Sequence, residues 1–238
     1  MVEINRLEDL SKLGSLTKDL LTLTTDGIIK FMKPMKIPFG IKVTGDTVFT
    51  GAQLNSEVHF GSKKAIFSST SNGSSLAFKN ICIRSDTALF DIKQNTLDRL
   101  VLDGCYVDAP DLGVANFKAL HLSELRCTNP NQQPLEIGSC NSITALGVTS
   151  STNFPLLDLS ETKTVRDHIV VRDFRDHGAG GLISLGVREA DETYLLATIP
   201  KRGIMVKRVP NQPCDLLRVI HNGYYVVPEL NAVRKYFG

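Results

Sequence analysis

A repeating pattern of short apolar triplets between residues 75 and 185 constrains the fold of this chain more than any other feature. Apolar residues at alternate positions predict strands with one buried face. A first set of triplets starts at intervals of 24, 20, 23 and 26 residues, at 76–78, 100–102, 120–122, 143–145 and 169–171. Two further sets follow within the units, at 81–83, 105–107, 125–127, 146–148 and Phe174, and at 90–92, 115–117, 135–137, 157–159 and 183–185.

The length of this repeat indicates a solenoid, because self-similarity at a period of 20 to 50 residues is typical of stacked repeat architectures. Three short strands per unit favour a parallel β-helix over a leucine-rich repeat, which has one strand and a helical return. The variable spacing agrees with this interpretation, because insertions in a solenoid fall in the turns and leave the stacked core unchanged. The sequence therefore predicts an all-β parallel β-helix with three strands per coil.

Two local stretches add to the repeat. Residues 26–31 read Asp-Gly-Ile-Ile-Lys-Phe and residues 35–43 read Met-Lys-Ile-Pro-Phe-Gly-Ile-Lys-Val. With them the chain resembles the single-stranded right-handed parallel β-helix of the pectate-lyase-like superfamily, and within it the tailspike and other virion proteins of bacteriophages. The resemblance covers about two thirds of the chain and is architectural. It implies a right-handed coil, and a function has to be argued from particular sites because one fold hosts many functions.

The chain divides into three expected parts. Residues 1–25 predict a helical cap or docking arm with two short helical pieces, the first with Asn5 as N-cap and Glu8 at the third helical position. Residues 26–187 predict the β-helix itself. Residues 188–238 predict a β-rich cap of hairpin character or strands exchanged between subunits, because four prolines interrupt the strand-like segments: Pro200, Pro210, Pro213 and Pro228.

Composition narrows the class of partner. With 27 basic and 25 acidic residues the formal charge is +2, which gives no electrostatic reason to expect nucleic acid. The chain has no apolar run of membrane-spanning length and no signal peptide pattern. Its five cysteines form no Cys-x-x-Cys pair, so Cys105 and Cys127 are interpreted as reduced core residues. We therefore expect synthesis in a host cytoplasm and no membrane insertion, and the resemblance to bacteriophage proteins implies a final location in a virion.

The outward positions of stacked coils form columns, because neighbouring strands lie about 4.8 Å apart. In the third set this column is acidic, and in the second set it carries tyrosine and arginine. The predicted members are Asp91, Asn116, Glu136, Asp158 and Ser184 in the first column, and Cys82, Tyr106, Arg126, Gly147 and Arg175 in the second.

Three interpretations of the acidic column stay open. Its carboxylates are solvated surface groups, or they contact Arg126 and Arg175 of a neighbouring subunit in a homotrimer that closes into a ring. The third interpretation is a glycosidase pair formed by Glu136 and Asp158, because glycoside hydrolysis uses two carboxyl groups about 5.5 Å or roughly 6.5 to 9.5 Å apart. No catalytic residue beyond this weak pair is predicted.

Other motifs add no chemistry. The five histidines are scattered, no zinc spacing or nucleotide-binding motif occurs, and the acidic turn at Asp108 and Asp111 is interpreted as solvated, so no metal or cofactor is expected. The signatures of polygalacturonase-like relatives are missing, and the chain has no tryptophan for a sugar platform. Taken with these absences, the resemblance implies a non-enzymatic virion component, such as a capsid decoration, head–tail or tail spike protein that binds other virion proteins. The alternatives are a polysaccharide-degrading glycosidase or lyase, or an adhesin that binds a host-surface glycan through Tyr106.

Overall fold

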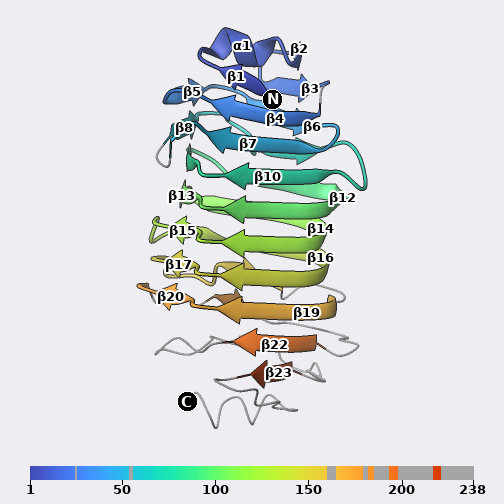
Figure 1. Cartoon of the computed structure of the whole chain (residues 1–238), viewed down its shortest axis with the longest axis vertical. Helices are drawn as coiled ribbons and strands as arrows, with labels where there is room; N and C mark the ends of the chain where they lie inside the picture. Colours follow the sequence, from blue (N-terminus) through green and yellow to red (C-terminus); the bar gives the residue numbers. More distant parts are fainter. Residues whose placement is uncertain are drawn as a thin grey trace.

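The protein is a right-handed parallel β-helix whose strands stack coil upon coil along one axis (Figure 1). The structure is a computed structural model that describes residues 1–24, 26–53, 56–159, 165–178, 182–184, 193–197 and 217–220. The predicted all-β fold with parallel coils is confirmed.

The main sheet takes one strand from each coil, and these strands are parallel. In spatial order they are β1 (Val2–Ile4), β4 (Gly27–Phe31), β7 (Thr47–Gly51), β10 (Ser75–Lys79), β12 (Phe90–Asp103), β14 (Asp111–Ser123), β16 (Gln133–Leu146), β19 (Val165–Arg172), β22 (Thr193–Ala197) and β23 (Leu217–Ile220). The first-set triplets all lie in this sheet, and their first residues are register partners: Leu76, Leu100, Leu120, Ile143 and Ile169.

Two more rows of strands complete each coil. The second sheet consists of β5 (Met35–Ile37), β8 (Glu57–Phe60), β11 (Cys82–Ser85), β13 (Tyr106–Asp108), β15 (Arg126–Cys127), β17 (Thr149–Ser150) and β20 (Arg175–Asp176). The third row consists of β3 (Leu20–Leu23), β6 (Gly40–Val43), β9 (Phe67–Ser69), the first residues of β12, β14 and β16, and then β18 (Leu157–Asp158) and β21 (Ile183–Ser184). The long strands β12, β14 and β16 run through both the third row and the main sheet, which makes the two rows one continuous hydrogen-bonded sheet.

The core is a stack of apolar side chains between the sheets. Its first half is aromatic: the ring of Phe78 lies 5.4 Å from that of Phe49, 4.7 Å from Phe67 and 6.0 Å from Phe90. All four rings are almost fully buried. Offset and edge-to-face pairs at such distances stabilise a core beyond the area that they bury. The second half is mostly aliphatic, and there Leu120, Ile143 and Leu157 are buried in the same way, together with Phe117.

The N-terminal segment differs from its prediction. It contains one helix, α1 (Leu7–Ser11), instead of two, and the N-cap is Arg6, with Asp9 at the third helical position. The Asp9 carboxylate accepts hydrogen bonds from the backbone N–H groups of Asn5 and Arg6, so the predicted Asn5 and Glu8 box is wrong by one residue. Buried Leu10 closes the end of the first coil.

The second predicted helical piece is a β-hairpin. β2 (Gly14–Leu16) pairs antiparallel with β3, and β3 then pairs in parallel with β6, while β1 pairs with β4. Alternation in Leu20-Leu21-Thr22-Leu23 places Leu21 and Leu23 in the core, which a helix could not do at this spacing. Residues 1–24 therefore belong to the same sheets as the coils that follow.

The described strands of the C-terminal segment continue the stack. β22 pairs in parallel with β19, and β23 pairs in parallel with β22, so these two strands form no hairpin with each other. The predicted boundary at residue 187 lies outside the described residues, and so does most of the segment expected to form a cap or to exchange strands.

The aromatic core generates a stability prediction. We expect Phe78→Ala to lower the free energy of unfolding by about 3–5 kcal/mol, because it removes a buried ring that contacts three others and leaves a cavity. Urea denaturation followed by circular dichroism measures the change. The control is Tyr106→Ala, which truncates a side chain that is 40% exposed. An equal loss in both variants would contradict the packing role given to Phe78.

Candidate functional site

The acidic column exists, but one predicted member is wrong. Register partners in the third row run from Asp91 through Val114, Glu136 and Asp158 to Ser184, so Val114 takes the place predicted for Asn116. Asn116 follows a register shift in β14. Its side-chain amide donates to the Lys93 carbonyl oxygen, and its Oδ1 accepts from the Ser139 hydroxyl.

A glycine explains the error. The strand equivalent to 90–92 is 113–115, in which Gly113 is the register partner of buried Phe90. A Cβ atom at Gly113 would lie 2.0 Å from the Phe90 carbonyl oxygen, and the residue has φ of +82°. Glycine is the residue that tolerates such a close approach and a positive φ. The apolar pattern therefore has a gap at this point, and the nearest apolar alternation lies two residues later.

The second column is also shifted at one coil. Its register runs through Cys82, Tyr106, Arg126, Thr149 and Arg175, so Thr149 replaces the predicted Gly147. Gly147 has φ of +64° and lies in the turn before Val148, which is buried. Tyr106 is 40% exposed, and Arg126 and Arg175 are exposed.

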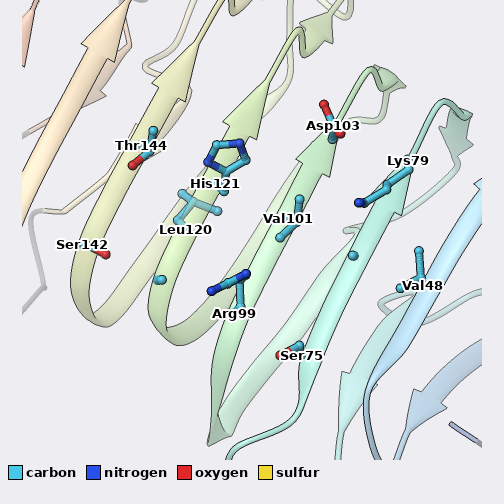
Figure 2. Close-up of a pocket in the computed structure, with 12 residues that line it drawn as sticks. Val48, Ser75, Lys79, Arg99, Val101, Asp103, Leu120, His121, Ser142 and Thr144 are labelled. Atoms are coloured by element: carbon cyan, nitrogen blue, oxygen red, sulfur yellow. The ribbon is translucent and has the colours of Figure 1, made fainter. Parts of the chain in front are cut away.

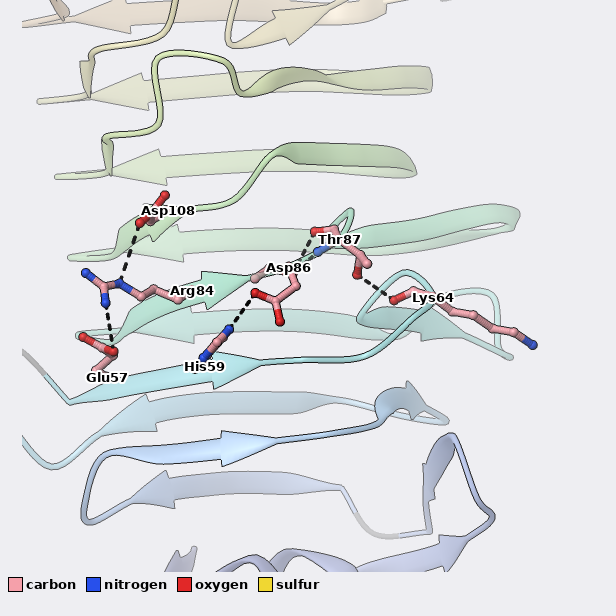
Figure 3. Close-up of polar contacts among 8 residues, drawn as sticks. Glu57, His59, Lys64, Arg84, Asp86, Thr87 and Asp108 are labelled. Carbon is pink, nitrogen blue, oxygen red and sulfur yellow. Dashed lines mark hydrogen bonds and ion pairs between the residues drawn. The ribbon is translucent and has the colours of Figure 1, made fainter.

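The next outward column of the second sheet holds two ion pairs and a hydrogen bond that connect the coils. Arg84 Nη1 lies 3.3 Å from Glu57 Oε1 and Arg84 Nε lies 3.7 Å from Asp108 Oδ2, while His59 Nε2 lies 2.8 Å from Asp86 Oδ1 (Figure 3). These side chains are substantially exposed, so each pair contributes little to stability. Glu57 and Asp108 thus have a partner of opposite charge, Arg84, within the chain, and the acidic turn that contains Asp108 is partly paired.

Glu136 and Asp158 are direct register partners on β16 and β18. Glu136 is exposed and Asp158 is half-buried. Adjacent parallel strands lie about 4.8 Å apart, so the backbone places these two residues near the shorter spacing of the sequence prediction. Asp91, farther along the column, contributes to a separate groove of about 380 Å³ with Lys18, Lys64 and Asp19. The predicted glycosidase pair does not line that groove.

A larger groove, of about 580 Å³, lies on the outer face of the main sheet (Figure 2). Its floor is formed by the middle residues of successive strands, among them Val48, Ala77, Val101 and His121. Charged side chains flank the floor, with Arg99 on one side and Lys79 and Asp103 on the other. These residues were not among the predicted site residues. The available signal was that triplets such as Leu76-Ala77-Phe78 and Leu100-Val101-Leu102 are apolar at their middle, outward position too.

The described cysteines are free thiols, and three of them are buried: Cys105, Cys127 and Cys140. Burial raises the pKa of each of these thiols to about 12. A thiol with such a pKa is largely protonated at neutral pH and is a poor nucleophile and metal ligand. Cys105 and Cys127 are core residues, as predicted.

Within the described ranges, no group of three metal-ligating side chains comes together. In the same part of the chain, no helix has the length and apolar character that a membrane span requires. Comparisons of the chain with protein-family models, with curated proteins and with solved structures find no match. The functional argument therefore depends on the geometry of the described residues.

The buried thiols predict a loss of stability at high pH. An unfolded thiol ionises near its ordinary pKa of 9.0, whereas folded Cys127 ionises only near 12. Between these values the unfolded state binds fewer protons, so the free energy of unfolding falls as pH rises, by about 1.4 kcal/mol per pH unit for each such thiol. Below pH 9 this contribution is fully present.

Urea denaturation at pH 8, 9.5 and 10.5 measures this slope. The comparison is with Cys127→Ala, which is less stable at pH 8 but whose slope is expected to be shallower by about 1.4 kcal/mol per pH unit. Lysine and tyrosine ionisation is common to both proteins and cancels in the difference. Equal slopes would show that Cys127 is not a buried thiol.

Proposed function

We propose that this chain is a structural component of a bacteriophage virion that assembles as a β-helical homotrimer. The observation that carries the proposal is the unbroken stack of coils, in which the main sheet continues in parallel from β1 to β23 (Figure 1). A rigid rod of this kind suits a capsid decoration protein, a head–tail protein or a tail spike. The proposal covers these three roles.

Rigidity follows from the way the coils are joined. From β4 to β21 each coil is hydrogen-bonded to the next in three rows of strands, and the buried side chains of the described residues form one continuous core along the axis. On the surface, Arg84 connects three successive coils through Glu57 and Asp108. In such a solenoid each coil is stabilised by contact with its neighbours, so the stack behaves as one rigid unit.

The surface chemistry also favours a scaffold. The predicted carboxylates lie along a column of the third row, where Val114 separates Asp91 from Glu136. Catalytic carboxyl groups usually lie in a cleft that raises the pKa of the acid by burial, whereas Glu136 is exposed. The most distinctive outward groups of the second sheet, including Arg84 and His59, are paired within the chain.

The test is biochemical. We expect the purified chain to have a molar mass near three times 26.1 kDa by light scattering, and mass spectrometry to find it at a fixed copy number in particles of the phage that encodes it. A monomer at all concentrations would contradict the homotrimer. Absence from washed particles would contradict the virion role.

A polysaccharide-degrading enzyme is the second candidate, because Glu136 and Asp158 are register partners. If the pair hydrolyses glycosidic bonds, Glu136→Gln should lower cleavage of bacterial polysaccharides at least about 100-fold, since general acid–base catalysis contributes about that much. Asp91→Asn, two coils away, is the matched control. For the scaffold we expect no cleavage by the wild-type protein in the same reducing-sugar assay.

A further inference from the structure

An apolar column runs along the outer face of the main sheet. The outward residues at the middle of successive strands are register partners of one another: Ile28, Val48, Ala77, Val101, His121 and Thr144. Four of the six are aliphatic, and Ile28 is 41% exposed. The register then continues through the positions of Val170, Leu196 and Ile220. Outward positions of a sheet that faces water are normally polar, so the run of aliphatic residues from Ile28 to Val101 favours a covering partner.

Charged residues on the two sides of this column are ordered by sign. On the side where the strands begin, successive coils carry Asp26, Asp46, Ser75 and Arg99. On the side where they end, the same coils carry Lys30, Thr50, Lys79 and Asp103. None of these charged side chains forms an ion pair with another residue in the described part of the chain.

This order of charges is complementary to itself. A rotation axis that runs parallel to the solenoid, in front of this face, relates one copy to the next. Each coil of one copy then meets the equivalent coil of the next copy. The beginning of a strand in one copy lies beside the end of the equivalent strand in the next copy. Asp26 would meet Lys30 of the next copy, and Arg99 would meet Asp103 of the next copy. Twofold and threefold rotation both give these pairs, because closed cyclic symmetry brings the two edges of the sheet together in both cases.

The opposite orientation is disfavoured. A copy with its solenoid reversed about an axis through β12 would place Arg99 against Arg99. It would also set Val48 against Thr144 and Ala77 against His121, so that aliphatic residues would face the polar residues of the column. Like charges brought together at an interface cost several kcal/mol and suppress the wrong arrangement. Charge and apolarity therefore select the same parallel, in-register neighbour.

We propose that the main-sheet face is the surface through which copies of this chain associate, with Val101 near the symmetry axis and Arg99 paired with Asp103 of the next copy. The inference rests on the self-association in the proposed function and names its surface. It differs from the contact predicted from the sequence, between the acidic column and the column of Tyr106, Arg126 and Arg175. Those columns are interrupted by Val114 and Thr149, whereas the aliphatic residues from Ile28 to Val101 follow one another without a break.

A charge exchange tests the pairing. We expect Arg99→Asp and Asp103→Arg each to raise the dissociation constant of the assembly at least about tenfold, because each places like charges in contact between copies. The double variant carrying both changes restores opposite charges and should recover the assembly. Within the chain, Asp103 lies beside its register partner Lys79. If Asp103→Arg acted only by repelling Lys79 of the same copy, the loss of assembly would persist in the double variant. Light scattering over a dilution series measures the constants, and circular dichroism checks the fold.

A crosslink tests proximity to the axis. Val101→Cys is expected to form a disulfide between copies under mild oxidation, seen as a dimer band on a non-reducing gel. Thr149→Cys, an outward position of the second sheet, is the matched control and should give no more dimer than the parent protein. Arg126→Glu combined with Arg175→Glu should leave the molar mass unchanged.

The outcomes separate this inference from the function on which it rests. A wild-type protein that is monomeric at every concentration would overturn both the homotrimer and this surface. An assembled protein that is unaffected by Arg99→Asp and gives no Val101→Cys crosslink would overturn the surface alone. Dissociation caused only by the Arg126 and Arg175 changes would move the interface to the second sheet.

Discussion

The parallel, in-register hydrogen bonding between successive coils is the constraint on which the rest of this structure depends. It fixes each strand about 4.8 Å from its equivalent in the next coil, so that every position of the repeat becomes a column. Inward columns must then pack against themselves, as the rings of Phe49 and Phe78 do at 5.4 Å. Outward columns place charged side chains of successive coils side by side, where like charges would repel. Arg84 avoids this repulsion by pairing with the acidic residues Glu57 and Asp108 of the adjacent coils.

This constraint also explains which parts of the fold could be predicted from the sequence. Inward residues such as Leu76, Leu100 and Leu120 must be apolar in every coil, so the first set of triplets matches the main sheet. The pattern fails where the backbone needs glycine more than the core needs a side chain. Gly113 occupies an inward position opposite Phe90, and Gly147 forms a turn, so the sequence placed Asn116 and Gly147 in columns to which they do not belong.

The candidate sites were less predictable than the fold, for a related reason. Outward polar residues are easily recognised between apolar neighbours, and Glu136 and Asp158 do lie side by side. An outward apolar residue gives no contrast: in Leu100-Val101-Leu102 all three residues look like core, and only the register shows that Val101 faces outward. The N-terminal segment misled in another way, because its leucine spacing suits a helix as well as the β2–β3 hairpin that it forms.

The column from Ile28 to Val101 and the charges beside it have different physical tasks. Apolar contact is non-directional, so this column alone would favour association in either orientation and at any offset along the axis. Sliding one copy by a single coil would keep most of the apolar contact. It would also move Asp103 from Arg99 to a neighbouring position held by Ser75 or Ala119 of the next copy. The charges therefore select orientation and register, while the aliphatic side chains supply the affinity, and a rod built from stacked coils of similar shape needs both.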